Sequence, residues 1–253
     1  MGPTEEYLLK RIKEEGAIHL VLIDPERFSP KTYTKICHES ERAGSAAILI
    51  GGSTISAPHE VDLATKAIKR SVKIPVILFP GNISGISRYA DAIFFMSLLN
   101  STNPYFIVGA QALGAPLVKK YKLEAIPLGY IIMGSGGAAG VVGYARPIPY
   151  NRPEIAAMHA LAAQYFGMRL IYLEAGSGAT EPIPPEAISH IKNVIDVPLI
   201  VGGGIRTGAD AKMAVEAGAD IIVTGTIVEQ TPLVRESLQE IIEGIRSVHP
   251  KGR

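Results

Sequence analysis

Pro198-Leu-Ile-Val-Gly-Gly-Gly-Ile-Arg-Thr207, followed by Ala219-Asp-Ile-Ile-Val-Thr-Gly-Thr226, is the part of the sequence that decides the fold. Each stretch is a short apolar strand that runs directly into small residues, chiefly glycines, whose bare backbone N–H groups can approach an anion. Between the two stretches, Thr207 and Asp210 mark the start of a helix and Gly218 marks its end. The sequence here predicts a strand–helix–strand unit with phosphate-binding turns.

Eight short apolar runs of this kind recur along the chain. Their continuous apolarity is typical of parallel strands that are covered on both faces, and helical patterns separate most of them. The runs are His19–Ile23, Ala46–Ile50, Pro75–Phe79, Ala92–Met96, Ala125–Met133, Arg169–Leu173, Leu199–Val201 and Ile221–Val223. This pattern favours a single α/β domain over residues 1–253, a (β/α)8 TIM barrel, over an open doubly wound sheet.

One repeat is shorter than the others. Only about ten residues separate Pro80 from Asp91, whereas a crossover with its helix ordinarily needs at least 10 to 12. We therefore expect the helix after the third strand to be missing or reduced to a turn. Such a gap is either a tolerated deletion or an opening that a long ligand can use.

Composition excludes several classes of protein. The chain has 25 basic and 24 acidic residues, a net charge of +1, so no global field attracts nucleic acid or an anionic membrane. One cysteine, Cys37, excludes an intrachain disulfide and suits a reducing compartment. The N-terminus lacks the apolar core of a signal peptide, and no run is long enough to span a bilayer. These features predict a cytoplasmic protein without stable membrane insertion.

The residues that follow the last three strands form a coherent set of N–H and hydroxyl donors. A (β/α)8 barrel places its active site at the C-terminal ends of the strands, often with a phosphate site after strands 7 and 8. Three adjacent loops of this composition point to a phosphate dianion more than to tight turns alone. The donors are Gly176, Ser177, Gly178, Gly203, Gly204, Gly225 and Thr226.

Glu174 and Tyr172 lie at the end of the sixth strand, beside this expected phosphate site. Glu174 is a candidate base or hydroxyl ligand for the molecule that carries the phosphate; the alternative is a surface carboxylate paired with a lysine. Tyr172 lies two residues earlier on the same face and is a candidate hydrogen-bond donor to substrate. Its alternative role is that of an ordinary core aromatic residue.

Asp24 follows the first strand and Ser53 follows the second, on the opposite side of the barrel mouth. Two oxygen ligands without a nearby histidine or cysteine suit Mg²⁺ better than Zn²⁺, although Asp24 before Pro25 can also be a simple turn residue. Two anion centres across one mouth fit a transferase with two phosphorylated substrates. The small apolar stretch 133–143 is either a wall for a greasy chain or a flexible loop.

Six motifs are shared with a known family: Leu22-Ile-Asp-Pro25, Gly51-Gly-Ser53, Phe79-Pro-Gly-Asn82, Tyr172-Leu-Glu-Ala-Gly-Ser-Gly178, Val201-Gly-Gly-Gly-Ile-Arg206 and Val223-Thr-Gly-Thr226. In them the chain resembles geranylgeranylglyceryl phosphate synthase, the archaeal ether-lipid prenyltransferase, over almost its whole length. The resemblance implies Mg²⁺-dependent transfer of a geranylgeranyl group from its diphosphate to the C3 hydroxyl of sn-glycerol 1-phosphate. It also implies a (β/α)8 barrel without a regular third helix, and a homo-oligomer built from dimers.

The resemblance also implies roles for particular residues. Asp24 and Ser53 hold magnesium and the diphosphate, and Glu174 orients or deprotonates the attacking hydroxyl. Glycerol phosphate is held by Tyr172, Leu173, Glu174, Ala175, Gly176, Ser177, Gly178, Gly203, Gly204, Gly225 and Thr226. The chain departs from the family at Glu26-Arg27, where relatives commonly carry Asp-Lys, so the contact of Arg27 with diphosphate is left open. The prenyl chain length is also left open.

Two other functions compatible with a phosphate cradle are retained as alternatives. A sugar-phosphate isomerase or lyase on the same barrel predicts a second acid or base at the mouth and has no need of magnesium. A noncatalytic sensor of a phosphorylated ligand keeps the cradle but can dispense with Asp24 and Glu174. Replacement of Asp24 by alanine separates these classes, because only the prenyltransferase needs that carboxylate.

Overall fold

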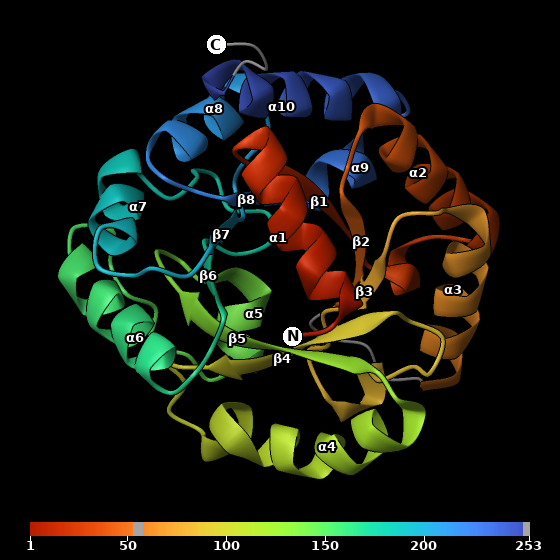
Figure 1. Ribbon diagram of the computed structural model, residues 1–253, viewed down its shortest axis with the longest axis horizontal. Coiled ribbons are helices and arrows are strands. Elements are labelled where there is room, and N and C mark those ends of the chain that lie inside the picture. The colour runs from red at the N-terminus through yellow and green to blue at the C-terminus, as the bar shows by residue number, and fades with distance from the viewer. Residues whose placement is uncertain (53–57, 250–253) are drawn as a thin grey trace.

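A computed structural model describes residues 1–52 and 58–249. Over these residues, eight parallel strands close into a barrel in sequence order, because the eighth strand returns to pair with the first. Figure 1 looks along the barrel and shows the helices arranged as a ring outside the strands. The strands are β1 (Ile18–Ile23), β2 (Ala47–Ile50), β3 (Val76–Leu78), β4 (Ala92–Leu98), β5 (Glu124–Ile132), β6 (Leu170–Glu174), β7 (Leu199–Gly202) and β8 (Ile221–Thr224). The expected TIM barrel is confirmed.

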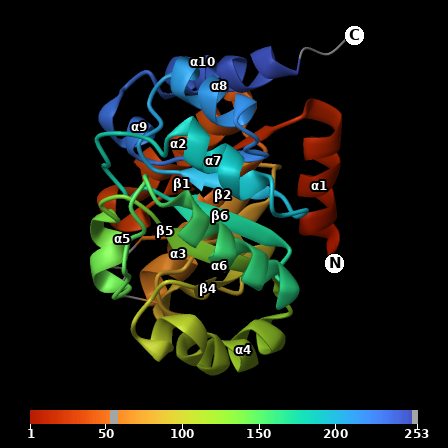
Figure 2. The ribbon, with the colours of Figure 1, turned by 90° about the vertical axis from the view of Figure 1, so that its left-hand side faces the viewer.

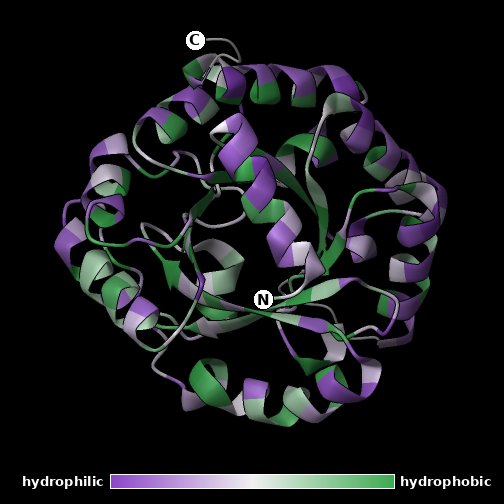
Figure 3. Cartoon of the chain, viewed as in Figure 1, coloured by the Kyte–Doolittle hydropathy of each residue, from purple (hydrophilic) through white to green (hydrophobic). Residues whose placement is uncertain are grey.

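Side chains from all eight strands meet in one buried cluster inside the barrel. Because side chains alternate along a strand, the remaining strand residues face outward and pack beneath the helices. Figure 3 shows the strands as largely apolar and the surrounding helices as a mixture of polar and apolar residues. The inner cluster includes Leu20, Leu49, Ile77, Phe94, Leu128, Tyr172, Ile200 and Val223.

The outer ring places helices between most of the strands, as the helical patterns predict. At the start of α8 the Thr207 hydroxyl accepts a hydrogen bond from the Asp210 N–H, and the Asp210 carboxylate accepts one from the Thr207 N–H. The predicted capping box is therefore present. Among the described residues, none of the helices is both long and apolar enough to cross a bilayer. The ring consists of α2 (Pro30–Ala43), α3 (Pro58–Ser71), α4 (Ala110–Tyr121), α6 (Pro153–Tyr165), α7 (Pro185–Lys192), α8 (Gly208–Glu216) and α10 (Val234–Val248).

The crossover from β3 to β4, described throughout residues 79–91, has no α-helix. It contains one three-residue 3₁₀ turn, η2 (Ile83–Gly85), which confirms that the helix after the third strand is reduced. The neighbouring α4 is preceded by a π-helical turn, η3 (Tyr105–Gly109), and a Cβ on its Gly114 would lie only 3.0 Å from the Ile86 side chain. This side of the barrel is therefore covered by a short turn and by the face of α4.

The N-terminal segment forms a helix that the sequence patterns did not single out, α1 (Pro3–Glu15). Figure 2 shows it across one end of the barrel, while two further short helices, α5 (Gly137–Val142) and α9 (Thr226–Gln230), lie toward the other end. Glu5 is buried and receives two hydrogen bonds from Arg169, at 2.6 and 2.7 Å. Glu124 accepts the first N–H groups of α1. The helix thus closes the end of the barrel opposite the candidate site.

Candidate active site

The loops that follow β6 and β7 touch each other through glycines. Gly203 and Gly204 have φ of 82° and 75°, and Gly176 has φ of 111°, a region that side chains other than glycine rarely adopt. A Cβ on Gly203 would lie 2.9 Å from the Gly176 backbone nitrogen. Arg206 strengthens the contact, because its Nη2 donates to the Ala179 carbonyl at 2.9 Å. The predicted clustering of these loops is therefore present.

The loop after β8 completes this group. Gly202 in β7 lies in register with Val223 in β8, so Gly225 and Thr226 continue from the strand beside the Gly203–Gly204 turn. Leu173 and Ala175 are also brought to this edge, but both side chains are fully buried in the layer beneath the helices. Their side chains therefore do not reach the mouth, and the Ala175 N–H donates to the Gly202 carbonyl at 3.0 Å.

One predicted donor has a different partner. The N–H of Gly176 donates to Oε1 of Glu174 at 2.7 Å, so in this structure it serves the carboxylate and not the anion site. The physical reason is the tight turn after β6, which brings the amide two residues ahead back over the glutamate. Ser177 is exposed and lies on the wall of the neighbouring pocket. A Cβ on Gly178 would meet no described atom within 4 Å, so this glycine faces open space.

Glu174 is a buried carboxylate at the end of β6, with 6% of its surface exposed. Besides Gly176, it accepts a hydrogen bond from the Tyr130 hydroxyl at 3.2 Å. Burial raises the pKa of Glu174 above its ordinary value, and the hydrogen bonds from Gly176, Tyr130 and Tyr172 partly offset that rise. A surface ion pair with lysine is therefore not its environment. A desolvated carboxylate with a raised pKa is the kind of group that general-base catalysis requires.

Tyr172 occupies the barrel interior and at the same time reaches the site. Its ring stacks on Phe79 at 5.2 Å and meets the Tyr130 ring edge-on at 5.1 Å. A Cβ on Gly202 would collide with its hydroxyl oxygen, so this glycine leaves room for the phenol. Tyr172 is thus a core aromatic residue whose hydroxyl hydrogen-bonds the carboxylate of Glu174, while a hydrogen bond from Tyr172 to substrate stays a prediction.

Asp24 lies across the mouth from Glu174, at the start of a one-turn 3₁₀ helix, η1 (Pro25–Arg27). Its Oδ1 accepts the Glu26 N–H at 3.1 Å, and a Cβ on Gly52 would lie 2.8 Å from its Oδ2. Burial raises its pKa, and the Glu26 N–H and nearby Arg27 act in the opposite direction. Ser53, the second predicted metal ligand, lies outside the described residues.

The donor set around Asp24 bears on how a magnesium ion can be held. Among the described residues there is no group of three or more His, Cys, Asp or Glu side chains placed to bind a metal. One carboxylate at an open mouth fits Mg²⁺ that arrives with a substrate phosphate and keeps several waters, which is common for this ion.

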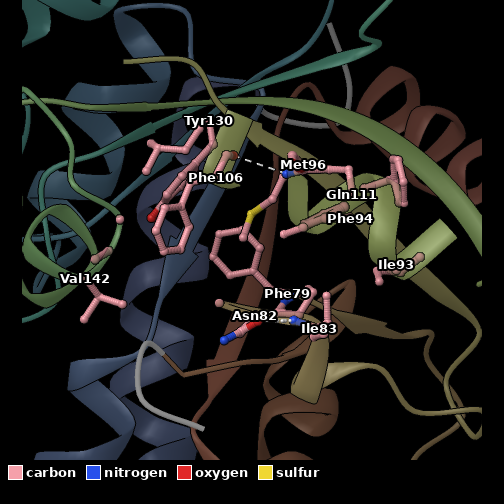
Figure 4. Close-up of a pocket in the computed structure, with 18 of the residues that line it drawn as sticks. Phe79, Asn82, Ile83, Ile93, Phe94, Met96, Phe106, Gln111, Tyr130 and Val142 are labelled. Atoms are coloured by element: carbon pink, nitrogen blue, oxygen red, sulfur yellow. Dashed lines mark hydrogen bonds between the residues drawn. The ribbon is translucent and has the colours of Figure 1, made fainter. Parts of the chain in front are cut away.

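An apolar pocket begins at these residues and runs toward the missing helix. It is open to solvent, with about 1070 Å³ of empty space that includes solvent at its opening, and is lined by Gly52, Glu174 and Ser177 at the mouth. Figure 4 shows Phe79, Met96 and Tyr130 along it, with Ile83 and Val142 at its sides. Ala139, Val142 and Gly143 of α5 and its end form one wall, so the stretch 133–143 serves as a wall of the groove.

Three residues at the site were not singled out for a role in the sequence. Tyr130 lies in the middle of an apolar strand, and no local pattern distinguishes it from a packing residue. Phe79 belongs to a quoted motif, but its stacking on Tyr172 depends on the pairing of distant strands. Oε2 of Glu229 lies 2.5 Å from Nη1 of Arg27. The two residues are far apart in the sequence, and only the closure of the barrel brings them together.

Fold and site together define a class of protein: a phosphate-binding TIM barrel with an adjoining apolar pocket for a long ligand. The profile of the PcrB family matches residues 10–245, and the chain belongs to that family. Geranylgeranylglyceryl phosphate synthase of Thermococcus gammatolerans is 56% identical over 249 residues, which cover 97% of this chain and 98% of that protein. The enzyme of the same name from Thermofilum pendens is 52% identical over 245 residues, covering 97% and 96%.

Solved structures agree with the sequence relatives. The crystal structure of (S)-3-O-geranylgeranylglyceryl phosphate synthase from Thermoplasma acidophilum, in complex with its substrate sn-glycerol-1-phosphate, matches with a TM-score of 0.94 and 43% identity, over 98% of this chain and 100% of that chain. A thiamine phosphate pyrophosphorylase from Pyrococcus furiosus, 14% identical with a TM-score of 0.62, shares the fold alone. The chain is accordingly an enzyme, a prenyltransferase of ether-lipid synthesis.

Proposed function

We propose that this enzyme transfers a geranylgeranyl group from geranylgeranyl diphosphate to the C3 hydroxyl of sn-glycerol 1-phosphate. The observation that carries the proposal is the position of Glu174, a buried carboxylate where the glycine loops meet the apolar pocket. The loops suit the phosphate of the acceptor, and the pocket suits a long hydrocarbon chain. A carboxylate at their junction lies where the acceptor hydroxyl and the first carbon of the prenyl chain must meet.

Glycerol phosphate is expected to bind against the loops after β6, β7 and β8. Gly203, Gly204, Gly225 and Thr226 offer backbone N–H groups and one hydroxyl, and Ser177 offers a second hydroxyl. Because the Gly176 N–H donates to Glu174, we do not expect it to bind the phosphate directly. Its role is to fix the carboxylate that faces the bound alcohol. The relative from Thermoplasma acidophilum was solved with sn-glycerol-1-phosphate, which supports this choice of acceptor.

The reaction replaces one C–O bond by another. The bond between the allylic carbon and the diphosphate oxygen breaks, the C3 oxygen of glycerol phosphate bonds to that carbon, and Glu174 takes the hydroxyl proton. Three hydrogen-bond donors hold the carboxylate in place for this step: the N–H of Gly176 and the hydroxyls of Tyr130 and Tyr172. A fixed base avoids the cost of orienting it during the reaction.

Asp24, together with Ser53, is proposed to hold Mg²⁺ and the diphosphate on the other side of the mouth. When bound, the ion supplies positive charge that stabilises the departing diphosphate. The pocket that begins at Gly52, beside Asp24, leads away along Phe79, Phe94 and Ile86. Its aromatic and aliphatic walls exclude water from the allylic carbon and favour attack by the bound alcohol over hydrolysis.

The family resemblance also implies an assembly of several chains. We propose a homo-oligomer built from dimers, as expected for this family. Sedimentation velocity of the full chain tests this directly, because a monomer at all concentrations would contradict it. The barrel itself contains the proposed catalytic residues, so the reaction proposed above does not depend on the outcome.

The defining experiment incubates the enzyme with sn-glycerol 1-phosphate, Mg²⁺ and prenyl diphosphates of several lengths, and identifies the ether product by mass spectrometry. sn-Glycerol 3-phosphate serves as the matched acceptor control, and a chelator tests the metal. We expect an ether product with the 1-phosphate and magnesium, and none after Asp24→Ala. Activity and magnesium dependence that survive Asp24→Ala would overturn the assignment and favour an isomerase, a lyase or a sensor.

A further inference from the structure

Arg27 connects the two sides of the mouth. Its Nη1 lies 2.5 Å from Oε2 of Glu229 in α9, and its Nε lies 3.4 Å from Oδ2 of Asp24. The side chains of Asp24 and Glu229 are only 14% and 17% exposed, whereas that of Arg27 is 51% exposed. One guanidinium thus bridges two half-buried carboxylates that belong to the first and last loops of the barrel.

Both ends of this bridge are attached to firm structure. On one side, the Asp24 carboxylate accepts the Glu26 N–H, and the Arg27 N–H donates to the Asp24 carbonyl at 3.2 Å. On the other side, Glu229 follows the buried Val228, whose N–H donates to the Gly225 carbonyl at 3.1 Å. The bridge therefore joins the proposed diphosphate loop to the turn that follows β8.

Arg27 contacts the two carboxylates at unequal distances. The contact with Glu229 is the shorter one, so the contact with Asp24 is loose and leaves that carboxylate able to take another cation. Without Glu229, the guanidinium could move closer to Asp24, its neighbour in the same turn, with which it already pairs at 3.4 Å. Glu229 holds the Arg27 guanidinium beside Asp24 and keeps it from closing fully on the Asp24 carboxylate. Neither Arg27 nor Glu229 can do this alone.

We propose that Arg27 and Glu229 are positioning residues that couple the binding of the two substrates. A ligand phosphate held at Gly225 and Thr226 fixes the start of α9, Glu229 then fixes Arg27, and Arg27 holds the Asp24 loop in the orientation that receives diphosphate. Coupling of this kind is reciprocal, so each ligand strengthens the binding of the other by the same factor. The inference rests on the proposed function, because it assigns one ligand to each side of the mouth.

The test measures binding and not turnover. Isothermal titration calorimetry of the full-length enzyme gives the dissociation constant of sn-glycerol 1-phosphate with and without geranylgeranyl thiolodiphosphate and Mg²⁺; in this analogue sulfur replaces the bridging oxygen and blocks transfer. We expect the wild-type affinity to rise by about fivefold or more when the second ligand is present. In Glu229→Gln the factor is expected to fall to about one, with the affinity for glycerol phosphate alone nearly unchanged.

Four further variants separate coupling from a structural role. Arg27→Met is expected to abolish coupling, and Arg27→Lys to retain part of it. The double variant Arg27→Met with Glu229→Gln should lose no more than either single change, since both break the same bridge. Glu236→Gln removes an equal charge from an exposed position of α10 and should leave the coupling intact. Thermal unfolding of each variant checks that the fold is kept.

Three results would overturn the inference. They are independent binding of the two ligands in the wild type, coupling that survives Glu229→Gln, and equal loss of coupling in Glu236→Gln. These outcomes differ from a failure of the proposed function itself. If neither sn-glycerol 1-phosphate nor the prenyl analogue binds the wild-type enzyme, the assigned substrates are wrong; if both bind independently, only the coupling is wrong.

Discussion

Replacement of Glu174 by glutamine tests the proposed chemistry most directly. Glutamine has nearly the same shape, so its side-chain oxygen can still accept the Gly176 N–H that now lies 2.7 Å from Oε1. Its amide group then faces the Tyr130 hydroxyl, which can rotate and accept in place of donating. The change therefore removes the negative charge and the proton acceptor while it can keep the hydrogen bonds with Gly176 and Tyr130.

The expected loss of turnover and the expected loss of affinity for the alcohol differ in size. Loss of a positioned general base lowers turnover by about 10²- to 10⁴-fold, or roughly 3 to 5 kcal/mol of transition-state stabilisation. Loss of one neutral contact to the bound alcohol costs about 1 kcal/mol, which is less than tenfold in affinity. We therefore expect kcat to fall by at least ten times the factor by which glycerol phosphate affinity falls.

The measurement combines single-turnover formation of the ether product with calorimetric binding of sn-glycerol 1-phosphate. Glu181→Gln, a carboxylate change in the loop beyond the cradle, serves as the matched control and should retain turnover. If Glu174→Gln keeps its turnover, Glu174 is not the base. If affinity falls as much as turnover, the residue acts in ground-state binding and not in the reaction.

Four further predictions follow from the same contacts. Tyr130→Phe removes a hydrogen bond that lowers the pKa of Glu174, so the acid limb of the pH–rate profile should move to higher pH. If the limb does not move, Tyr130 does not influence the titration of the catalytic base. Asp24→Asn should raise the Mg²⁺ concentration needed for half-maximal activity without weakening glycerol phosphate binding in calorimetry. Gly203→Ala places a Cβ 2.6 Å from Oε1 of Glu174 at a φ of 82°, and should lower stability by about 1 to 3 kcal/mol in urea unfolding. Burial lowers the pKa of His19 from 6.5 to about 3, so below pH 6.5 the unfolded state alone takes up this proton. The free energy of unfolding should then fall by about 1.4 kcal/mol for each unit by which the pH is lowered. Urea titrations between pH 6.5 and 4 check this, because a stable His19→Gln variant should lack this contribution.

The local patterns of the chain were sufficient for most of the barrel. All eight strands form at the predicted apolar runs, most of which are bounded by glycine, proline or charge, since a strand covered on both faces needs continuous apolarity. Residues 81–90 were too few for a regular crossover helix, and the structure has only η2 there. Helix α1 was missed as an element, because its packing against Arg169 and Glu124 depends on positions more than one hundred residues away.

For the site, the sequence indicated the side chains that follow each strand but not their partners. Glycines after β6 and β7 could be recognised as backbone donors, yet only the folded turn shows that Gly176 donates to Glu174. Leu173 and Ala175 belong to a recognised motif, but their side chains face the helical layer. A motif identifies which residues gather at an edge, whereas the pleat of the strand decides which way each side chain points.

The sequence by itself determined the repeat, the phosphate-binding turns, the shortened third crossover and the family. These are local properties, set by strand length, glycine positions and the alternation of apolar and polar runs. Only the tertiary structure decided that Tyr130 and Tyr172 hold Glu174, and that Arg27 lies between Asp24 and Glu229. Those contacts arise from barrel closure, which brings the first and last strands side by side, and no pattern along the chain records a distance across the mouth.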